Sequence, residues 1–434
     1  MINIDFKKIK NKVYNINSLK VEGKVKKVVG LTIEVEGIQA FVGEVCIIYA
    51  IDGRKIFSEV VGFKDNAVLL MPLGELTGVS PGSPVEPTGK ALKVKVGPGL
   101  LGKVLDGIGR AMDKSKIEFE DEYNLDNDPP SPLSRQRIKT VMTTGIRAID
   151  GFLTCGVGQR VGIFAGSGVG KSTLLGMIAR YSDADVNVIG LIGERGREVR
   201  EFIEKDLGEE GMKKSVVVVA TSDQPPLLRL KGAFTATAIS EYFRDKGLKV
   251  MLMMDSVTRF AMAQREVGLT IGEPPATKGY TPSVFAMLPR LMERSGNSER
   301  GSITAFYTVL VDGDDMNDPI ADAARGILDG HIVLSRKIAS KNHYPAIDVL
   351  SSISRLMPEI ADESLRLKAG ELREIMALYR ESEDLINIGA YQKGSNPEVD
   401  RAISLIGRIN DFLRQGMNEY SNFQETTRSM MSIE

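Results

Sequence analysis

Hydrophobic positions fall into three successive patterns along the chain. In residues 18–90, short runs of alternating apolar and polar residues are separated by Gly, Asp and Asn, which is typical of a small antiparallel β-barrel. Within residues 133–356, continuous apolar runs alternate with helical segments, which indicates buried, largely parallel strands. In residues 357–434, apolar side chains recur at helical spacing. The pattern predicts a β-barrel domain, an α/β domain and a C-terminal helical domain.

The same runs place individual elements. Barrel strands are expected at 24–29, 31–35, 44–49 and 67–71, and core strands at 160–164, 186–192, 215–220, 250–254, 302–310 and 330–335. Helical segments are expected at 174–180, 234–245 and 319–329. Asn396-Pro397-Glu398 has the residues of a helix cap and first turn, so a further helix is expected to begin there.

Three segments are expected to lie outside these domains. Proline-rich stretches at 80–87 and 127–132 are expected to be linkers, so that residues 91–132 form a connecting segment. Residues 1–17 carry apolar side chains among lysines, at a spacing compatible with a short amphipathic helix. Such a tail is either disordered or a docking peptide for a partner.

The composition is that of a soluble protein of several domains. The 434 residues are 42% hydrophobic and 26% charged, and 56 Lys and Arg against 57 Asp and Glu leave a net charge of −1. No global basic field favours nucleic acid. Cys46 and Cys155 have no CxxC spacing, so we expect reduced core residues rather than a disulfide or a metal site. A signal peptide and long apolar spans are not expected either, which favours a cytoplasmic location.

A phosphate-binding loop lies at residues 165–173, between the strand expected at 160–164 and the helix expected at 174–180. Its glycines allow backbone N–H groups to surround phosphates at a helix N-terminus. Lys171 would reach the β- and γ-phosphate oxygens, and the Ser172 hydroxyl would bind Mg²⁺. Ala165 replaces the glycine that usually opens the motif. The residues expected to bind ATP are Gly166, Ser167, Gly168, Val169, Gly170, Lys171, Ser172 and Thr173.

Two carboxylates further along the chain could complete a phosphoryl-transfer site. Asp255 ends an apolar run, like the aspartate that holds Mg²⁺ in a Walker B strand, although it could instead cap the next helix. Glu194 follows the strand after the phosphate-binding loop and belongs to the chemical class that orients and polarises an attacking water. The charged residues at 194–201 are equally compatible with a solvated helix start.

Longer motifs resemble one known family. The phosphate-binding loop, Gly193-Glu194-Arg195 and segments 255–260, 344–348 and 352–355 resemble the rotary ATP synthases and hexameric secretion ATPases, over essentially the whole chain. Segments 154–160, 219–226, 253–266, 272–282 and 306–317 are similar to the flagellar and type III secretion export ATPases, and most of all to the flagellar members. The resemblance implies a RecA-like P-loop NTPase core between the barrel and the helical domain. It also implies ATP hydrolysis that energises export of flagellar proteins.

The resemblance implies roles for matching residues. Glu194 would be the catalytic carboxylate that activates water, with Arg195 and Arg259 as supporting charges and Lys171 on the phosphates. Tyr344 would pack against adenine, since a ring stacks on a base without hydrogen bonds, although it could be an ordinary half-buried tyrosine. Arg355 would be an arginine finger that reaches across a subunit boundary, although it could be a surface arginine at a helix start.

A finger donated by a neighbour implies a homohexameric ring of composite sites, with residues 268–279 facing the central channel. The resemblance further implies five kinds of partner: a regulatory stator-like protein that binds the N-terminal tail, a central-stalk-like protein, export substrates, chaperones and a membrane export gate. The chain would then be cytoplasmic and peripheral at the membrane export apparatus.

Three other functions share parts of this pattern. The ATPase of a virulence-type (injectisome) secretion system carries most of the same motifs. A non-catalytic ring subunit of the ATP synthase type would lack the water-activating carboxylate, and Glu194 argues against it. An RNA translocase would need a basic, aromatic-rich barrel surface, but the barrel region has aromatic residues without a dense basic stripe.

Overall fold

The computed structural model describes residues 22–311 and 315–434. The chain divides after Leu92 into two compact units, a barrel and a larger unit that begins at Lys93, and each is described by itself. The predicted docking segment, residues 1–17, lies outside the described residues. Among the helices that the structure describes, none combines the length and the apolar character needed to cross a membrane.

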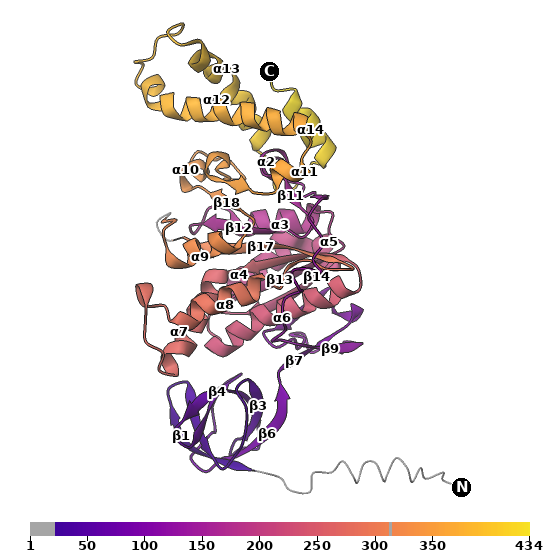
Figure 1. Ribbon diagram of the computed structural model, residues 1–434, viewed down its shortest axis with the longest axis vertical. Helices are drawn as coiled ribbons and strands as arrows, with labels where there is room; N and C mark the ends of the chain where they lie inside the picture. Colours follow the sequence, from indigo (N-terminus) through magenta and orange to yellow (C-terminus); the bar gives the residue numbers. More distant parts are fainter. Residues whose placement is uncertain (1–21, 312–314) are drawn as a thin grey trace, which may run out of the picture. The chain divides into compact units, whose positions relative to one another are not determined.

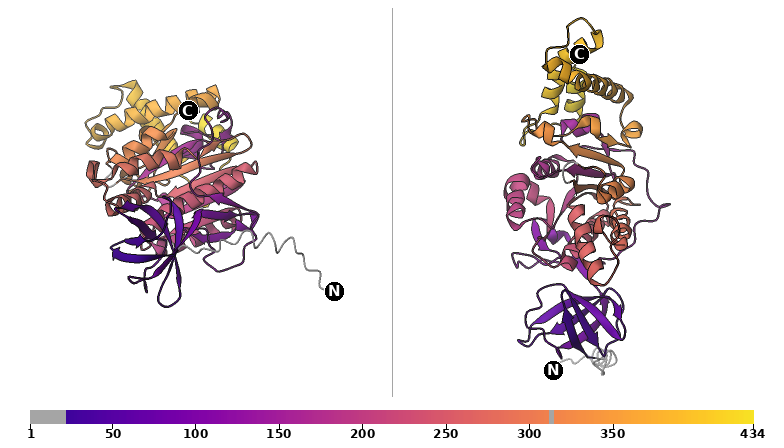
Figure 2. Two further views of the ribbon diagram at one scale, coloured as in Figure 1. Left: turned by 60° about the horizontal axis from the view of Figure 1, so that its bottom comes forward. Right: turned by 90° about the vertical axis from the view of Figure 1, so that its left-hand side faces the viewer.

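The first unit is a closed six-stranded antiparallel barrel, which confirms the prediction (Figure 2). Its strands pair in the order β1-β2-β5-β4-β3-β6, and β6 closes on β1. The strands are β1 (Gly23–Val29), β2 (Thr32–Glu36), β3 (Glu44–Tyr49), β4 (Lys55–Lys64), β5 (Ala67–Pro72) and β6 (Pro84–Ala91). Alternate side chains fill the interior, among them Ile33, Val35, Ile48 and Leu70. Cys46 is buried there as a free thiol, as predicted.

A nine-stranded, mostly parallel sheet forms the centre of the second unit (Figure 1). Its order is β19-β18-β12-β17-β15-β13-β14-β8, with β16 paired to β17. All six predicted core strands are present: β12 (Arg160–Ala165), β13 (Val186–Ile192), β14 (Ser215–Ala220), β15 (Lys249–Asp255), β17 (Ser302–Leu310) and β18 (Gly330–Leu334). The short strands are β8 (Lys103–Asp106), β16 (Gly296–Asn297) and β19 (Ile353–Ser354).

Helices cover both faces of this sheet. Successive side chains of each apolar strand point to opposite faces, so both faces offer apolar side chains on which helices can pack. Ile189 and Leu191 join the cluster below α3, whereas Gly190 between them faces Ala236 of α6. The helices of the sheet region are α2 (Arg147–Phe152), α3 (Lys171–Tyr181), α4 (Gly196–Glu201), the π-turn η2 (Phe202–Leu207), α5 (Gly208–Lys213), α6 (Pro226–Asp245), α7 (Val257–Thr270), α8 (Pro282–Met292), α9 (Pro319–Ile327) and α10 (Arg336–Ala339).

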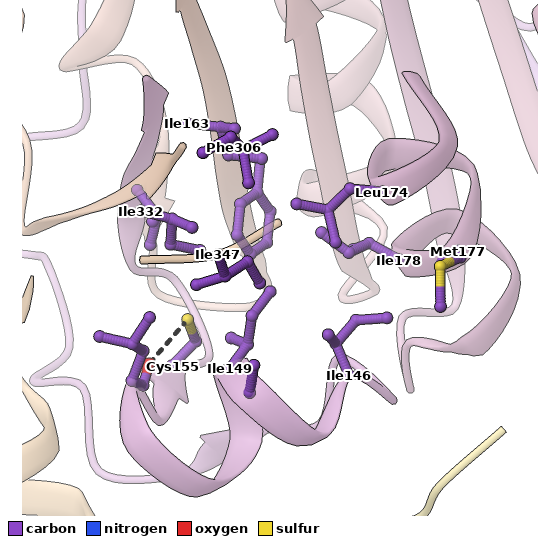
Figure 3. Packing of buried hydrophobic residues seen from close by; sticks show 14 of the residues in the cluster. Ile146, Ile149, Cys155, Ile163, Leu174, Met177, Ile178, Phe306, Ile332 and Ile347 are labelled. Atoms are coloured by element: carbon purple, nitrogen blue, oxygen red, sulfur yellow. Dashed lines mark hydrogen bonds between the residues drawn. The ribbon is translucent and has the colours of Figure 1, made fainter. Parts of the chain in front are cut away.

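A large apolar cluster, which we call the main apolar cluster, lies on the α3 side of the sheet. Figure 3 shows side chains from two helices and three strands pointing toward one another there, including Ile149, Leu174, Ile178, Ile163, Phe306 and Ile332. Cys155 is a buried free thiol at its edge, and its Sγ–H donates to the Leu153 carbonyl at 3.4 Å. Together these contacts fix α3, and with it the phosphate-binding loop, on the sheet.

The predicted C-terminal helices are confirmed as α11 (Met357–Ile360), α12 (Glu363–Asn387), α13 (Pro397–Leu413) and α14 (Phe423–Met431). The carboxamide of Asn396 accepts hydrogen bonds from the N–H groups of Glu398 and Val399, so the predicted cap is present. α14 lies beside α2, and α12 packs on α13 (Figure 1). Phe412 and Met430 reach the main apolar cluster.

Residues 91–132 differ from the expected connecting segment. β8 pairs in parallel with β14 and forms one edge of the main sheet. β7 (Lys93–Val96) and β9 (Asp121–Asn124) form a separate antiparallel pair, and β7 contacts α6. Each of these strands has four residues, which is too short for an alternating pattern to stand out in the sequence. The remaining short pair is β10 (Val141–Met142) with β11 (Cys155–Gly156).

Candidate functional site

A cavity of about 680 Å³ lies at the carboxyl ends of the parallel strands. β12, β13, β15 and β17 end at the same edge because they run in the same direction, and ligands of open α/β sheets bind at this edge. The cavity is lined by Gly166, Ser167, Gly168, Gly170, Lys171, Ser172, Thr173, Gly193, Glu194, Arg195, Glu198, Ser222, Arg259 and Leu310.

The phosphate-binding loop forms one wall of the cavity. Gly168 and Gly170 have φ angles of +78° and +88°, a region that favours glycine, and Gly170 directly precedes α3. The other loop residues predicted to bind nucleotide also line the cavity, except Val169. The Val169 side chain is 2% exposed and belongs to the main apolar cluster, so only its backbone can face a ligand.

Lys171 lies beside two carboxylates that are distant from it along the chain, Asp255 and Glu194. Its Nζ lies 2.5 Å from Oδ1 of Asp255 and 3.6 Å from Oε1 of Glu194. All three side chains are nearly buried, with exposed fractions of 13%, 5% and 15% for Lys171, Asp255 and Glu194. Thr308 Oγ1 donates a further hydrogen bond of 2.7 Å to the same Asp255 oxygen. The site therefore brings one cation and two anions together, with most of each side chain buried.

These contacts change the proton affinity of the site. Burial lowers the pKa of Lys171, but the charges of Asp255 and Glu194 outweigh burial and raise it above its usual value. Burial and the neighbouring Asp255 charge raise the pKa of Glu194 to about 7, although Lys171 opposes the shift. Glu194 is therefore a carboxyl that exchanges its proton near neutral pH, as a general base requires.

Arg259 contributes a buried donor beside Glu194. Gly193 has φ +73°, and a Cβ there would lie 2.6 Å from Cβ of Arg259, so a glycine lets the arginine stem pack against this turn. Within the described part of the chain, Nε of Arg259 is buried without a hydrogen-bond partner. The Arg259 side chain also lines the cavity, so its positive charge is suited to an anion such as a phosphate oxygen.

Arg195 lies at the mouth of the cavity rather than in its interior. Its side chain is 80% exposed, and Nη1 pairs with Oε1 of Glu198 at 3.4 Å. The geometry thus separates Arg195 from the buried cluster of Lys171, Glu194 and Asp255.

Tyr344 lies beside Gly170, at the end of the phosphate-binding loop that leads into α3. A Cβ at Gly170 would be 3.4 Å from Cδ1 of the Tyr344 ring, so the ring is in contact with the loop. The ring is also 43% exposed, which leaves part of it open to a ligand. This placement suits an aromatic side chain that stacks on the base of a nucleotide whose phosphates lie in the loop.

Arg355 lies near the amino ends of the parallel strands, whereas the cavity lies at their carboxyl ends. Its backbone N–H bonds to the carbonyl of Asp329, whose own N–H bonds to the carbonyl of Arg160, the first residue of β12. The loop follows the last residue of β12, Ala165, and the five steps from Arg160 to Ala165, at about 3.3 Å each, separate the two ends of the strand by roughly 17 Å. The exposed Arg355 side chain therefore cannot reach the cavity of its own chain.

The donor set fits a magnesium nucleotide. Mg²⁺ is usually held by one or two carboxylates together with substrate phosphates and water, and Asp255 with the Ser172 hydroxyl supplies groups of that kind. Gly168 would accept a Cβ without meeting any atom within 4 Å, so the loop encloses open space where phosphates can lie against backbone N–H groups.

The site contains three further residues that were not predicted from the sequence, two in the cavity wall and one behind it. Ser222 lines the wall, and its backbone N–H bonds to the carbonyl of Glu194 at 3.0 Å. Leu310 is anchored by a hydrogen bond from its N–H to Thr258 Oγ1 at 2.8 Å. Thr308 is fully buried and holds Asp255. A threonine within an apolar strand carries no signal in one sequence, so only the pairing of β15 with β17 reveals it.

Three family models match the chain. Residues 145–354 match the nucleotide-binding domain of the ATP synthase alpha/beta family, residues 25–89 match its beta-barrel domain, and residues 361–432 match the T3SS EscN ATPase C-terminal domain. The two matches to one family thus fall on the barrel and the sheet, and the third falls on the C-terminal helices.

Similar proteins cover nearly the whole chain. It is 58% identical to the flagellum-specific ATP synthase of Bacillus subtilis, over 96% of each chain. It is 53% identical to the type 3 secretion system ATPase of Xanthomonas euvesicatoria, over 95% of this chain and 93% of that one. The structure of the assembled ATPase EscN from enteropathogenic E. coli superposes with a TM-score of 0.89 at 46% identity, and covers 95% of this chain and 99% of EscN.

Substitution of Thr308 by Val tests the support of Asp255. Valine has nearly the shape of threonine but cannot donate, and a lost hydrogen bond to a charged group costs roughly 1.5–3 kcal/mol. We expect a lower urea midpoint for Thr308→Val, measured by circular dichroism. Thr308→Ser keeps the hydroxyl and should fall between the wild type and Thr308→Val. Equal midpoints for wild type and Thr308→Val would show that the bond is unimportant.

Proposed function

This chain belongs to the family of flagellum-specific ATP synthases and type III secretion ATPases, and on that premise we propose that it hydrolyses ATP to energise export of flagellar proteins. The observation that carries the proposal is the cluster of Lys171, Glu194 and Asp255 at the phosphate-binding loop. A nucleotide-binding domain without a water-activating carboxylate would bind ATP but not turn it over. Glu194 supplies that carboxylate.

The loop residues and Lys171 bind the phosphates in this proposal. Backbone N–H groups at the start of α3 surround the phosphate oxygens, and Lys171 neutralises charge on the β- and γ-phosphates. Ser172 and Asp255 would hold Mg²⁺, which neutralises charge that develops on the phosphoryl group. The guanidinium of Arg259, which lines the same cavity, offers a further positive charge to this anion. Tyr344 stacks on adenine.

Glu194 orients and polarises the attacking water. Its carboxylate lies 3.6 Å from the Lys171 ammonium, so it faces the place where the γ-phosphate would lie. A base with a pKa of about 7 is ionised in a large share of the protein molecules at neutral pH and still binds a proton readily. Arg195, exposed at the cavity mouth, would support this charge only from a distance.

The active form in this proposal is a homohexameric ring. Arg355 lies too far from its own cavity, so it would act on the phosphate of a neighbouring subunit. The structure of assembled EscN, and that of EscN in complex with its central stalk EscO, support an assembled ring with a stalk partner for this chain as well. Residues 268–279 would then face the channel.

The remaining partners follow from the proposed role. Residues 1–17 would dock a regulatory stator-like protein, and export substrates with their chaperones would meet the ring at a membrane export gate. The chain would be peripheral to that gate, in the cytoplasm. An injectisome role is the second candidate, because the relative from Xanthomonas and the C-terminal family model both belong to type III secretion.

The Glu194→Gln variant tests the catalytic carboxylate. Glutamine has the same size but cannot take a proton, so we expect MgATP binding within about threefold of the wild type and a loss of turnover of about 10²-fold or more. Turnover is measured by phosphate release and binding by calorimetry. Near-normal hydrolysis would refute the assignment.

Glu201→Gln is the matched control for this variant, since Glu201 makes the same kind of exposed ion pair as its neighbours on α4 and lies outside the cavity. It should hydrolyse ATP like the wild type. In a flagellated bacterium that lacks its own export ATPase, the wild-type chain should restore filaments and Glu194→Gln should not. Rescue of injectisome secretion without rescue of filaments would select the second candidate.

The pH dependence of kcat/KM tests the proton affinity of Glu194. A general base must be ionised, so activity should be lost as the pH falls through about 7, and the slope should approach tenfold per pH unit. The profile of kcat/KM reports the free enzyme, which is the state described here. A flat profile between pH 6 and 8 would contradict the proposed base.

Mixed rings test the donated arginine. Arg355→Ala keeps the cavity and Lys171→Ala keeps the finger, so each variant alone should be almost inactive. At a 1:1 ratio about one quarter of the interfaces would pair an intact cavity with an intact finger, and roughly that fraction of turnover should return. No recovery at any ratio would exclude action across the subunit boundary.

A further inference from the structure

The end of α13 and the turn after it, residues 412–419, join the C-terminal helical region to the nucleotide cavity through one buried side chain. Gln415 is 4% exposed. Its Nε2 donates to the carbonyls of Gly145 and Glu419 at 2.8 and 2.7 Å, and its Oε1 accepts from the N–H of Arg147 at 2.8 Å. The carboxamide thus uses both donors and its acceptor in contacts with buried or half-buried backbone.

The backbone of Gln415 reaches Tyr344. Its N–H donates to the Tyr344 carbonyl at 2.9 Å, and the Tyr344 ring lies against Gly170 of the phosphate-binding loop. One residue of the C-terminal region therefore holds the main chain of the proposed base-stacking side chain.

Other contacts keep the turn in place. Arg147 Nε donates to the carbonyl of Phe412 at 2.7 Å, and its guanidinium also bonds to the Arg414 carbonyl and the Glu419 carboxylate. At the far end of α3, the Tyr181 hydroxyl donates to the Met417 carbonyl at 3.1 Å. The turn is thus attached near both ends of α3.

We propose that Gln415 is a positioning residue for base recognition, which fixes Tyr344 in place and thereby determines how tightly the adenine base is held. The inference rests on the proposed role of Tyr344. Loss of the carboxamide would leave the Arg147 N–H and the Gly145 carbonyl without their partner, so the turn would shift until those groups reach water. The bond from Gln415 N–H to Tyr344 would be lost with that shift.

The proposal makes a prediction that a purely structural role does not. Base binding should weaken, whereas phosphate binding at the loop should stay unchanged, because the hydrogen bonds of Gln415 go to Gly145, Arg147, Glu419 and Tyr344. Aromatic stacking on a base accounts for roughly a 5- to 150-fold gain in affinity. We expect Gln415→Ala to lower the affinity for a ligand that carries the base about tenfold.

The experiment compares two ligands by calorimetry on the full chain. MgADP carries the base, and magnesium pyrophosphate does not. For Gln415→Ala, the Kd of MgADP should rise about tenfold while that of pyrophosphate changes less than twofold. Gln415→Glu, which keeps the acceptor but cannot donate, serves as a second variant if Gln415→Ala fails to fold. Gln392→Ala, at an exposed loop position in the same region, is the matched control and should bind both ligands like the wild type.

Tyr344→Ala separates the two possible failures. If it weakens MgADP selectively and Gln415→Ala does not, the inference is overturned and the proposed base site stands. If Tyr344→Ala leaves the ratio of the two Kd values unchanged, the proposed base site fails and the inference fails with it. An equal loss of both ligands in Gln415→Ala would reveal a purely structural role. In the supporting outcome, the double variant is no weaker than Tyr344→Ala.

Discussion

The site depends on the burial of one ammonium between two carboxylates. A buried charge costs several kcal/mol unless it is paired, so Lys171 can stay charged in this space only because Asp255 and Glu194 lie beside it. The balance is incomplete, since two anions face one cation. Burial and the charge of Asp255 raise the pKa of Glu194 to about 7, while Asp255 keeps the shorter contact with Lys171 and the hydrogen bond from Thr308. The Lys171 ammonium would therefore already be in position when a phosphate binds.

Parallel strands are what bring these groups together. Lys171 and Asp255 are 84 positions apart, yet each follows or ends a strand of the same sheet. This part of the site could be predicted from the sequence, because the phosphate-binding motif and the apolar runs before Glu194 and Asp255 mark strand ends, and the ends of parallel strands share one edge. The barrel and the C-terminal helices were predictable for a similar reason, since alternation and helical spacing recur over many residues.

Other features could not be read from the sequence because they depend on neighbours that only the folded chain supplies. Thr308 holds Asp255 through the register of two adjacent strands, and nothing in its own surroundings along the chain distinguishes it. Gly193 is required by the Arg259 stem that packs on it. Arg195 follows Glu194 directly, but the turn into α4 directs it outward. Strands of four residues in 93–132 are too short for periodicity to reveal.

In the proposed ring, strand length would set the division of the site between subunits. Because β12 separates Arg160 from the phosphate-binding loop, whatever is attached near its first residue lies a full strand away from the cavity. Arg355 is attached there, and no side-chain rotation within one chain can close that distance. A chain of this fold thus carries a cavity at the carboxyl ends of its parallel strands and an arginine near their amino ends. Repetition of the same interface around a closed ring is the arrangement that would give every cavity a finger, as proposed for Arg355.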